Sequence, residues 1–347
     1  MQETELLGRS KFFKILLFLV CPFSFSYPQV FPVKKVDSLL NTGIENIVNQ
    51  KYDLAKKDFL ILEKEYPQLP VGKIYVAVVE IASSYDLAIP FRSEFIKEKL
   101  DEAEDLSEKL IDSDESNIWN YYFLALATGY KAYFDALTGD WLSAFGAGVT
   151  SVNLFEHCLE VDSSFHEALI AIGTYKYWKS SKMEFLNWLP FVKDEREEGI
   201  KLLERAVNNS TYNSYLAINS LIWIYIDRRE FRKAIKIAES VLRQYPNSRF
   251  FKYGLARAYE DVDRQKSIEI YYEILNSFAD SERLNHYNEI VLKHLIAQQY
   301  ARLGEYDSAL ALCDEILSIK NITNYVLNKL RDRLDRVKSL KKEISNR

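Results

Sequence analysis

The chain has 347 residues, a formal net charge of −5 and hydrophobic residues at 48% of its positions. That apolar fraction supplies a substantial core and excludes global disorder. Acidic and basic residues are interspersed without a long basic stripe, which argues against nucleic acid as a partner. Only 11 Gly and 8 Pro interrupt the sequence, so few tight turns are expected and helices are favoured over a many-stranded sheet.

Residues 1–26 have the pattern of a secretory signal peptide. Basic residues at 9, 11 and 14 precede the apolar run Ile15–Phe23, and Ser24 and Ser26 suit cleavage after Ser26. The run is shorter than the roughly 20 residues that span a bilayer. We therefore expect a periplasmic or secreted protein with no transmembrane span after signal removal. An N-terminally membrane-tethered protein is the alternative, and peripheral association with the cell envelope is compatible with both.

A spacing of 3, 4, 3 and 5 positions occurs twice in the chain, and parts of it occur at four further places. It separates Tyr52, Ala55, Phe59, Leu62 and Pro67, and again Phe231, Ala234, Ala238, Val241 and Pro246. Steps of 3 and 4 place side chains on one stripe of a helix. A small residue on that stripe lets an antiparallel helix approach closely, and the proline ends the helix. The pattern therefore predicts the second helix of a helical hairpin.

In chain order, the sequence predicts seven helix pairs and a closing helix. The pairs are Val36–Val48 with Tyr52–Glu65, Gly72–Leu87 with Ser93–Asp112, Ile118–Leu137 with Trp141–Val161, Phe165–Ser180 with Asp194–Asn208, Asn213–Asp227 with Phe231–Gln244, Arg249–Val262 with Arg264–Ser277, and Glu282–Leu303 with Tyr306–Ser318. The closing helix, Thr323–Ser345, has one apolar face and a charged outer face. Such a polar outer face keeps the end of a stacked array soluble.

These patterns resemble the tetratricopeptide repeat, a unit of roughly 34 residues that forms two antiparallel helices. The fullest copy contains Ile296, Ala297, Tyr300, Gly304, Tyr306, Ala309, Cys313 and Ile316. The resemblance implies an all-α solenoid of about seven antiparallel helix pairs. The repeat domain would span residues 27–321, and residues 322–347 would form a C-terminal capping helix.

Residues 118–210 depart from a regular array. The third pair is long, and an apolar insert with Pro190 occupies residues 180–193, inside the fourth pair. The order of Gly173–Trp178, Leu189-Pro190 and Asp194–Gly199 resembles the tetratricopeptide repeat protein 39 family and its bacterial relatives. That narrower resemblance implies scaffolding rather than chemistry.

No catalytic or cofactor-binding signature is present in the sequence. The four histidines show no H-x-x-x-H spacing, and neither a phosphate-binding glycine loop nor a G-x-S-x-G motif occurs. Cys158 and Cys313 fall on apolar faces of predicted helices, which indicates buried free thiols. We therefore expect no enzyme activity, no metal site and no cofactor.

Binding of a protein or peptide is the function that these patterns favour. First helices of stacked pairs line a concave groove, and aromatic and Arg side chains there suit an extended peptide or a partner helix. The repeat register places eight candidates in the groove: Asn219, Trp223, Asp227, Tyr253, Arg257, His294, Gln298 and Arg302. Alternatively, Trp223 and Tyr253 pack between helices. Leu40 and Ile44 stand where chaperone-binding relatives carry a carboxylate clamp, which disfavours that class.

The insert at residues 180–193 supports a second hypothesis, a carrier or sensor of a small apolar ligand. Its candidate residues are Trp178, Phe185, Trp188 and Phe191. The apolar cluster is either a docking lip for a ligand, partner or membrane surface, or a plug that fills the gap beside the irregular pair. Our first hypothesis is still that the protein is an exported scaffold or adaptor that binds a protein or peptide in its groove.

Overall fold

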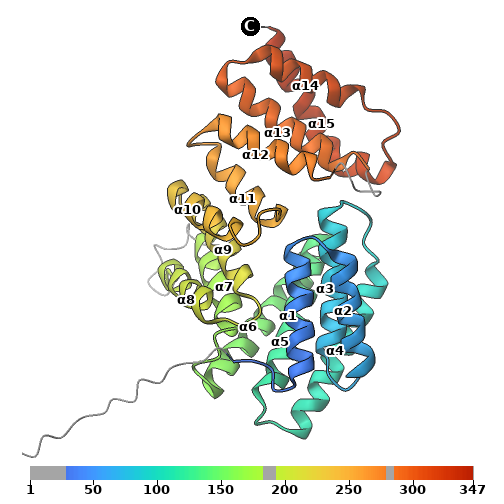
Figure 1. The fold of residues 1–347 in the computed structure, drawn as a ribbon, viewed down its shortest axis with the longest axis vertical. Coiled ribbons are helices and arrows are strands. Elements are labelled where there is room, and N and C mark those ends of the chain that lie inside the picture. Colours follow the sequence, from blue (N-terminus) through green and yellow to red (C-terminus); the bar gives the residue numbers. More distant parts are fainter. Residues whose placement is uncertain (1–28, 183–192, 279–284, 347) are drawn as a thin grey trace, which may run out of the picture.

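A computed structural model describes residues 29–182, 193–278 and 285–346 (Figure 1). Within these ranges the chain forms fifteen α-helices and no strand. The helices are α1 Lys34–Val48, α2 Tyr52–Glu65, α3 Val71–Asp86, α4 Ser93–Ser113, α5 Ile118–Thr138, α6 Trp141–Val161, α7 Ala168–Lys182, α8 Arg196–Asn209, α9 Ser214–Asp227, α10 Phe231–Leu242, α11 Arg249–Tyr259, α12 Arg264–Asn276, α13 Tyr287–Leu303, α14 Tyr306–Ser318 and α15 Asn324–Ser345.

The all-α solenoid of seven helix pairs with a closing helix is confirmed. Helices α2, α6 and α14 have the predicted ends. Helix α7 begins at Ala168 rather than at Phe165, because the preceding residues form successive turns in which the Phe165 N–H donates to the Asp162 carbonyl at 2.9 Å. The predicted signal peptide lies outside the described residues, as do Phe185, Trp188 and Phe191. No described helix is both long and apolar enough to cross a bilayer.

The two helices of a pair bury different amounts of their surface. In α10, four residues on one stripe are buried: Ala234, Ile235, Ala238 and Val241. In α3, eleven of the sixteen residues are buried, and α5 and α9 are similarly apolar around their circumference. A helix that is apolar on all sides must be enclosed by other elements. The first helices α3, α5 and α9 therefore lie inside the stack, and second helices such as α10 lie outside.

Turns inside five of the pairs use a residue with positive φ: Gln50 (56°), Ala88 (51°), Gly139 (90°), Arg229 (58°) and Gly304 (81°). Three of these residues carry a Cβ, for which the left-handed conformation costs about 1 kcal/mol. Hydrogen bonds made by Gln50 and by Ala88 offset this cost at those two positions. The Gln50 side chain accepts from the Arg249 N–H at 3.0 Å, and the Ala88 carbonyl accepts from Asn285 at 2.8 Å.

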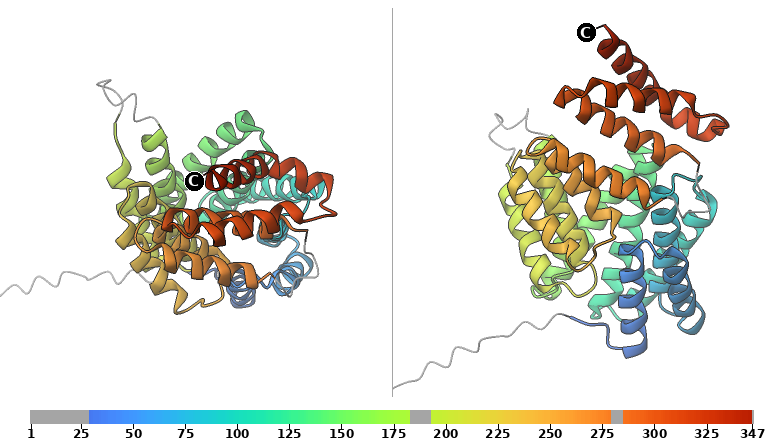
Figure 2. Two further views of the ribbon diagram at one scale, coloured as in Figure 1. Left: turned by 90° about the horizontal axis from the view of Figure 1, so that it is seen from above. Right: turned by 45° about the horizontal axis from the view of Figure 1, so that its top comes forward.

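The stack curves until its C-terminal part meets its start (Figures 1 and 2). Ser248 Oγ donates to the Val48 carbonyl at 2.8 Å, and the Arg249 guanidinium pairs with the Asp86 carboxylate, Nε to Oδ1 being 3.0 Å. Asn288 Nδ2 donates to the Asp86 carbonyl at 2.7 Å. Residues about 200 positions apart are thus in contact, and the solenoid closes on itself.

Aromatic rings fill the inside of the first turn of the solenoid. The Phe31 ring lies 5.2 Å from Trp119 between centroids, and Trp119 lies 5.3 Å from Phe165. Phe59 and Tyr75 stack at 4.9 Å. Edge-to-face and offset contacts at these distances add to the stability gained from burying the rings. The inner face of α1–α6 is therefore largely a packed core rather than an open groove.

One buried carboxylate organises the polar groups in that core. Glu167 accepts from the backbone N–H groups of Thr211 (2.6 Å) and Tyr212 (2.8 Å) and from Asn213 Nδ2 (3.0 Å). The hydroxyl of Tyr75 donates to Asn213 Oδ1 at 3.4 Å. Burial raises the pKa of Glu167, while the three donors favour its charged form. The start of α7, the α8–α9 connection and α3 are thereby joined.

Candidate binding groove

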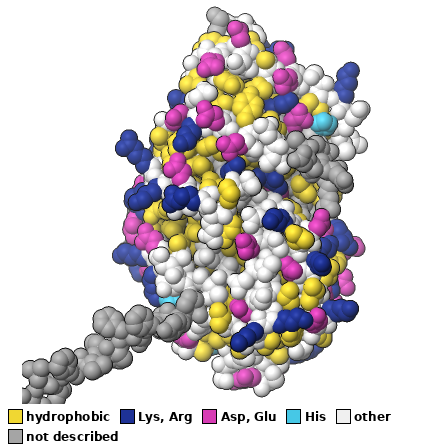
Figure 3. Space-filling view, in the orientation of Figure 1, with side chains coloured by type: hydrophobic (Ala, Val, Ile, Leu, Met, Phe, Trp, Pro, Cys, Tyr) yellow, Lys and Arg dark blue, Asp and Glu magenta, His cyan; other side chains and the backbone are white. Residues whose placement is uncertain are grey.

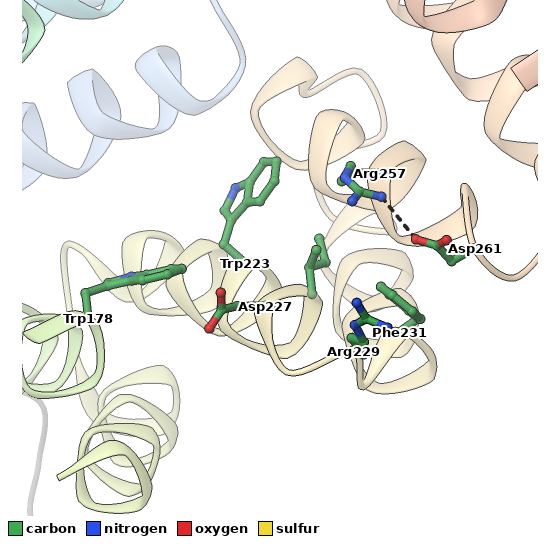
Figure 4. Close-up of a pocket in the computed structure, with 8 residues that line it drawn as sticks. Trp178, Trp223, Asp227, Arg229, Phe231, Arg257 and Asp261 are labelled. Carbon is green, nitrogen blue, oxygen red and sulfur yellow. Dashed lines mark hydrogen bonds and ion pairs between the residues drawn. The ribbon is translucent and has the colours of Figure 1, made fainter. Parts of the chain in front are cut away.

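A hollow of about 510 Å³ lies across α7, α9 and α11, the first helices of three successive pairs (Figure 4). Four of the residues predicted from the sequence line it: Trp178, Trp223, Asp227 and Arg257. The other lining residues are Ile226, Arg229, Phe231 and Asp261. In Figure 4, Trp178 stands at one end and the Arg257–Asp261 pair at the other, with Trp223 between them. Trp223, Asp227 and Arg257 were predicted from the repeat register, whereas Trp178, 79 positions before Arg257, was predicted as part of the apolar insert cluster.

Two glycines fix the position of α7 against α8. A Cβ atom at Gly173 would lie 2.8 Å from the carbonyl oxygen of Gly199, and a Cβ atom at Gly199 would lie 2.5 Å from that of Gly173. Real Cβ atoms do not approach backbone this closely, so only glycine permits the contact. Both glycines belong to the sequence pattern of the irregular middle region. Their close approach brings Tyr177 and Trp178 to the edge of the hollow.

Asp227 is held in place by side chains from α7. Tyr177 Oη donates to its Oδ2 atom at 2.7 Å, and Ser181 Oγ donates to the same atom at 3.2 Å. Burial and the Asp227 carboxylate together raise the pKa of Tyr177, so Tyr177 stays a donor at neutral pH. These bonds orient a negative charge at the floor of the hollow without neutralising it.

Arg257 and Arg302 share a carboxylate that the sequence analysis missed. Arg257 Nη1 lies 3.2 Å from Glu260 Oε2 and 3.3 Å from Asp261 Oδ2, while Arg302 Nη1 lies 3.6 Å from Glu260 Oε2. Glu260 is buried and also accepts from Tyr271 Oη at 2.7 Å. Its position one turn after Arg257 on α11 was the available signal. The shared carboxylate connects two predicted groove residues from α11 and α13.

Two residues that line the hollow have side-chain surface that a ligand could contact. The Trp223 side chain is 37% exposed, which is high for an indole set among helices. Arg229 is exposed, and within residues 29–182, 193–278 and 285–346 its guanidinium has no ion-pair partner. Its left-handed backbone (φ 58°) lacks the side-chain compensation seen at Gln50. The hollow therefore offers an aromatic surface beside an available guanidinium.

The other predicted groove residues differ in exposure. Asn219, Tyr253 and Gln298 are half-buried, and burial raises the pKa of Tyr253. His294 is only 1% exposed, so the prediction that it faces an open groove is wrong. The cause is α15, whose Arg333 covers it, with Nη1 3.3 Å from His294 Nδ1.

The two cysteines in the described part of the chain lie in helices, as the sequence predicts. Cys158 and Cys313 are free and buried, and burial raises the pKa of Cys158 to about 12. Among the described residues, no group of His, Cys, Asp or Glu is arranged to hold a metal ion. One apolar surface was not predicted: Trp141, Leu142 and Phe145 at the start of α6 are strongly exposed.

Comparison with known proteins places this chain among helical repeat proteins. A family model for the tetratricopeptide repeat matches residues 221–248, which lie in α9, α10 and the turns beside them. No curated protein sequence gives a significant match. The match and the architecture confirm the prediction of a tetratricopeptide-type solenoid. The narrower resemblance to the tetratricopeptide repeat protein 39 family stays a prediction.

Several solved structures are similar in fold. YrrB, described as a TPR protein with an unusual peptide-binding site, is 13% identical over 66% of this chain and 100% of its own, with a TM-score of 0.43. The thermophilic TPR protein TTC0263 from Thermus thermophilus is 15% identical over 64% of this chain and 98% of its own, with a TM-score of 0.41. A tetratricopeptide repeat protein from Parabacteroides merdae ATCC 43184 is 12% identical over 90% and 100%, with a TM-score of 0.39.

Proposed function

We propose that this helical-repeat protein of the tetratricopeptide type is a scaffold or adaptor that binds a protein or peptide segment in the groove across α7, α9 and α11. The observation that carries the proposal is the hollow of about 510 Å³, in which Trp223 is exposed and Arg229 lacks an ion-pair partner among the described residues. Trp and Arg are the residue types that most often dominate protein interfaces. The proposed role requires no catalytic group and no cofactor.

The groove is preorganised for a partner. Tyr177 fixes Asp227, and Glu260 fixes both Arg257 and Arg302. A rigid site loses less side-chain entropy on binding, so more of the contact energy appears as affinity. Apolar and charged side chains alternate around the hollow, which suits a peptide with both kinds of group. The same mixture disfavours the alternative, a carrier of a purely apolar small molecule.

Export is part of the proposal, supported by the sequence pattern of residues 1–26. We propose a periplasmic or secreted location, with the groove available to partners of the cell envelope. N-terminal sequencing of the protein purified from its source tests this. A mature chain that begins at Tyr27 is expected, and a chain that retains residues 1–26 contradicts cleavage.

A peptide-display selection on the full chain tests groove binding. Selected peptides are measured by fluorescence anisotropy against wild type, Trp223→Ala and Arg257→Ala. Each variant should raise Kd about 10- to 30-fold, the loss expected for removal of an interface hot spot. Trp141→Ala removes an equally large indole that is 71% exposed on α6 and should leave Kd unchanged. Equal affinity of both groove variants and wild type would overturn the proposal.

A further inference from the structure

Three basic residues form a stripe along one face of α15. Lys329, Arg333 and Arg336 are separated by four and three positions, which aligns them on one side of a helix. In the part of the chain that the structure describes, none of the three pairs with a carboxylate. Other basic residues of the same helix do pair, Lys338 with Asp335 at 3.0 Å and Lys341 with Asp314. The alternation of Asp and Arg at residues 331–336 conceals this stripe in the linear sequence.

The middle residue of the stripe, Arg333, is half-buried against α13, while Lys329 and Arg336 are exposed on either side of it. Arg333 Nη1 contacts His294, a buried residue at a groove position of α13. Lys329 Nζ lies 5.5 Å from the centroid of the Phe91 ring, in the α3–α4 connection, and 4.8 Å from the Tyr325 ring. The stripe therefore extends from α13 toward the end of α3, where the solenoid closes. In Figure 1, α15 lies above α11, next to α13.

Arg333 is a partly desolvated cation with no anion beside it. Burial and the neighbouring Arg336 lower its pKa. His294 offers no negative charge, because its Nδ1 atom accepts from Arg333 and its proton is then on Nε2. The Nε2 atom has no hydrogen-bond partner among the residues described. Proteins rarely leave a partly buried charge uncompensated, so the site has donors in excess and lacks an acceptor.

Two partly exposed tyrosines lie on the elements near the Lys329 end of the stripe. Tyr85 and Tyr133, at the ends of α3 and α5, are 62% and 48% exposed. Nevertheless, burial raises the pKa of Tyr133 to about 12. Tyr85 is close enough to Lys329 for that cation to lower the Tyr85 pKa against the effect of burial. The Tyr85 phenol thus lies near the Lys329 end of the stripe.

We propose that Lys329, Arg333 and Arg336 bind the carboxylate side chains of an acidic segment of a partner protein. This inference rests on the proposed function, since the segment would continue from the peptide held across α7, α9 and α11. The seven positions from Lys329 to Arg336 cover roughly 10 Å of helix, about the length of three extended peptide residues. Two acidic residues on alternate positions of a partner strand therefore match the stripe.

Charge favours a peptide over a nucleic acid as the occupant. A nucleic-acid strand binds along a continuous basic track, whereas here the stripe has three cations and the chain carries −5 overall. Two carboxylates near the inner face are already paired, Asp86 with Arg249 and Glu260 with Arg257 and Arg302. The three cations of the stripe have no such partner and are therefore available to an acidic segment.

The test compares two labelled peptides that share one groove-binding sequence selected on the wild-type chain. One continues with Glu-Gly-Glu-Glu and the other with Gln-Gly-Gln-Gln, and both end in an amide so that side chains supply all the difference. Wild type should bind the Glu peptide at least 10-fold tighter at low salt, with the advantage falling as salt rises. The variant Lys329→Gln/Arg333→Gln/Arg336→Gln should reduce the preference below about 2-fold.

Lys338→Gln/Lys341→Gln/Lys342→Gln is the matched control, because it makes the same charge change on the same helix and should keep the preference. Arg336→Gln alone changes an exposed side chain and should lower the preference at least 3-fold while the circular dichroism melt stays unchanged. Loss of the preference in the control triple variant overturns the inference, as does a preference that survives in the stripe variant. Tighter binding of a single-stranded oligonucleotide than of the Glu peptide also overturns it.

The two proposals fail in different ways. Trp223→Ala should weaken the Glu and Gln peptides by the same factor, which reports on the groove across α7, α9 and α11. The stripe variant should weaken only the Glu peptide. If Trp223→Ala has no effect while the stripe variant removes the preference, the groove proposal fails. If Trp223→Ala acts and wild type shows no preference, the acidic-segment inference fails alone.

Discussion

The two halves of this solenoid use the same helix pairs but differ on their inner face. In α1–α6 the first helices α3 and α5 are apolar all round, and aromatic rings fill the interior. In α11–α15 the inner face carries Arg257, Arg302 and Arg333 together with buried Glu260. The acidic and basic side chains are meanwhile interspersed over the surface shown in Figure 3. The apolar side chains along which the two helices of a pair pack determine the fold. The remaining face of the first helix determines whether the groove is filled or open.

The largest effect on stability is expected from removal of Glu167, the buried carboxylate in the part of the solenoid whose interior is filled. Glu167→Ala leaves the N–H groups of Thr211 and Tyr212 and the amide of Asn213 without their acceptor. Loss of a buried, fully bonded carboxylate should lower the free energy of unfolding by about 3–5 kcal/mol. Urea denaturation followed by circular dichroism measures it. Glu160→Ala, at an exposed site on α6, should change stability by less than about 0.5 kcal/mol. A loss below about 1 kcal/mol for Glu167→Ala would contradict the role of this network.

In the open half, acid should weaken the fold through His294. Burial, with Arg333 and Arg336 nearby, lowers the pKa of His294 from 6.5 to about 4. The unfolded chain therefore binds a proton that the folded chain does not, and stability contributed at His294 is lost as pH falls from about 6.5 to about 4. The expected loss is about 3 kcal/mol.

The pH dependence is measured by urea unfolding at pH 7 and at pH 4 in wild type and in His294→Gln, which cannot titrate. The variant should lose about 3 kcal/mol less than wild type over this range. Parallel curves for the two proteins would show that His294 is not the titrating group. Arg333→Gln should reduce the same dependence partially, because one of the two nearby cations is removed.

The smallest effect concerns the turn between α9 and α10. Arg229→Gly relieves a left-handed backbone conformation, and the gain is partly offset by the greater freedom of glycine in the unfolded chain. The free energy of unfolding should rise by about 0.5–1 kcal/mol. The reverse change, Gly304→Ala, should lower it by about 1 kcal/mol. If Arg229→Gly destabilises the chain, the guanidinium makes a stabilising contact and is not available to a ligand.

The local architecture was readable from the sequence, and the long-range arrangement was not. Helix α14 could be predicted residue by residue because Tyr306, Ala309 and Cys313 follow the stripe and Gly304 ends the preceding helix. Trp223 and Arg257 could be placed in one groove because neighbouring repeats share a register. The covering of His294 depends on where α15 packs, and the Asp86–Arg249 pair depends on how far the stack curves. Neither follows from spacing along the chain.

Closure of the solenoid has a consequence for how the chain folds during synthesis. In an open repeat array each unit contacts only its neighbours, so folding can follow the ribosome. Here the carbonyl of Asp86 receives its bond from Asn288, 202 positions later. At about 5–20 residues per second that partner emerges roughly 10–40 s after Asp86. During this time the first helix pairs lack their contacts with the C-terminal part of the chain. Once the chain is complete, these contacts make the unfolding of the first and last units cooperative, which a linear array of the same repeats would lack.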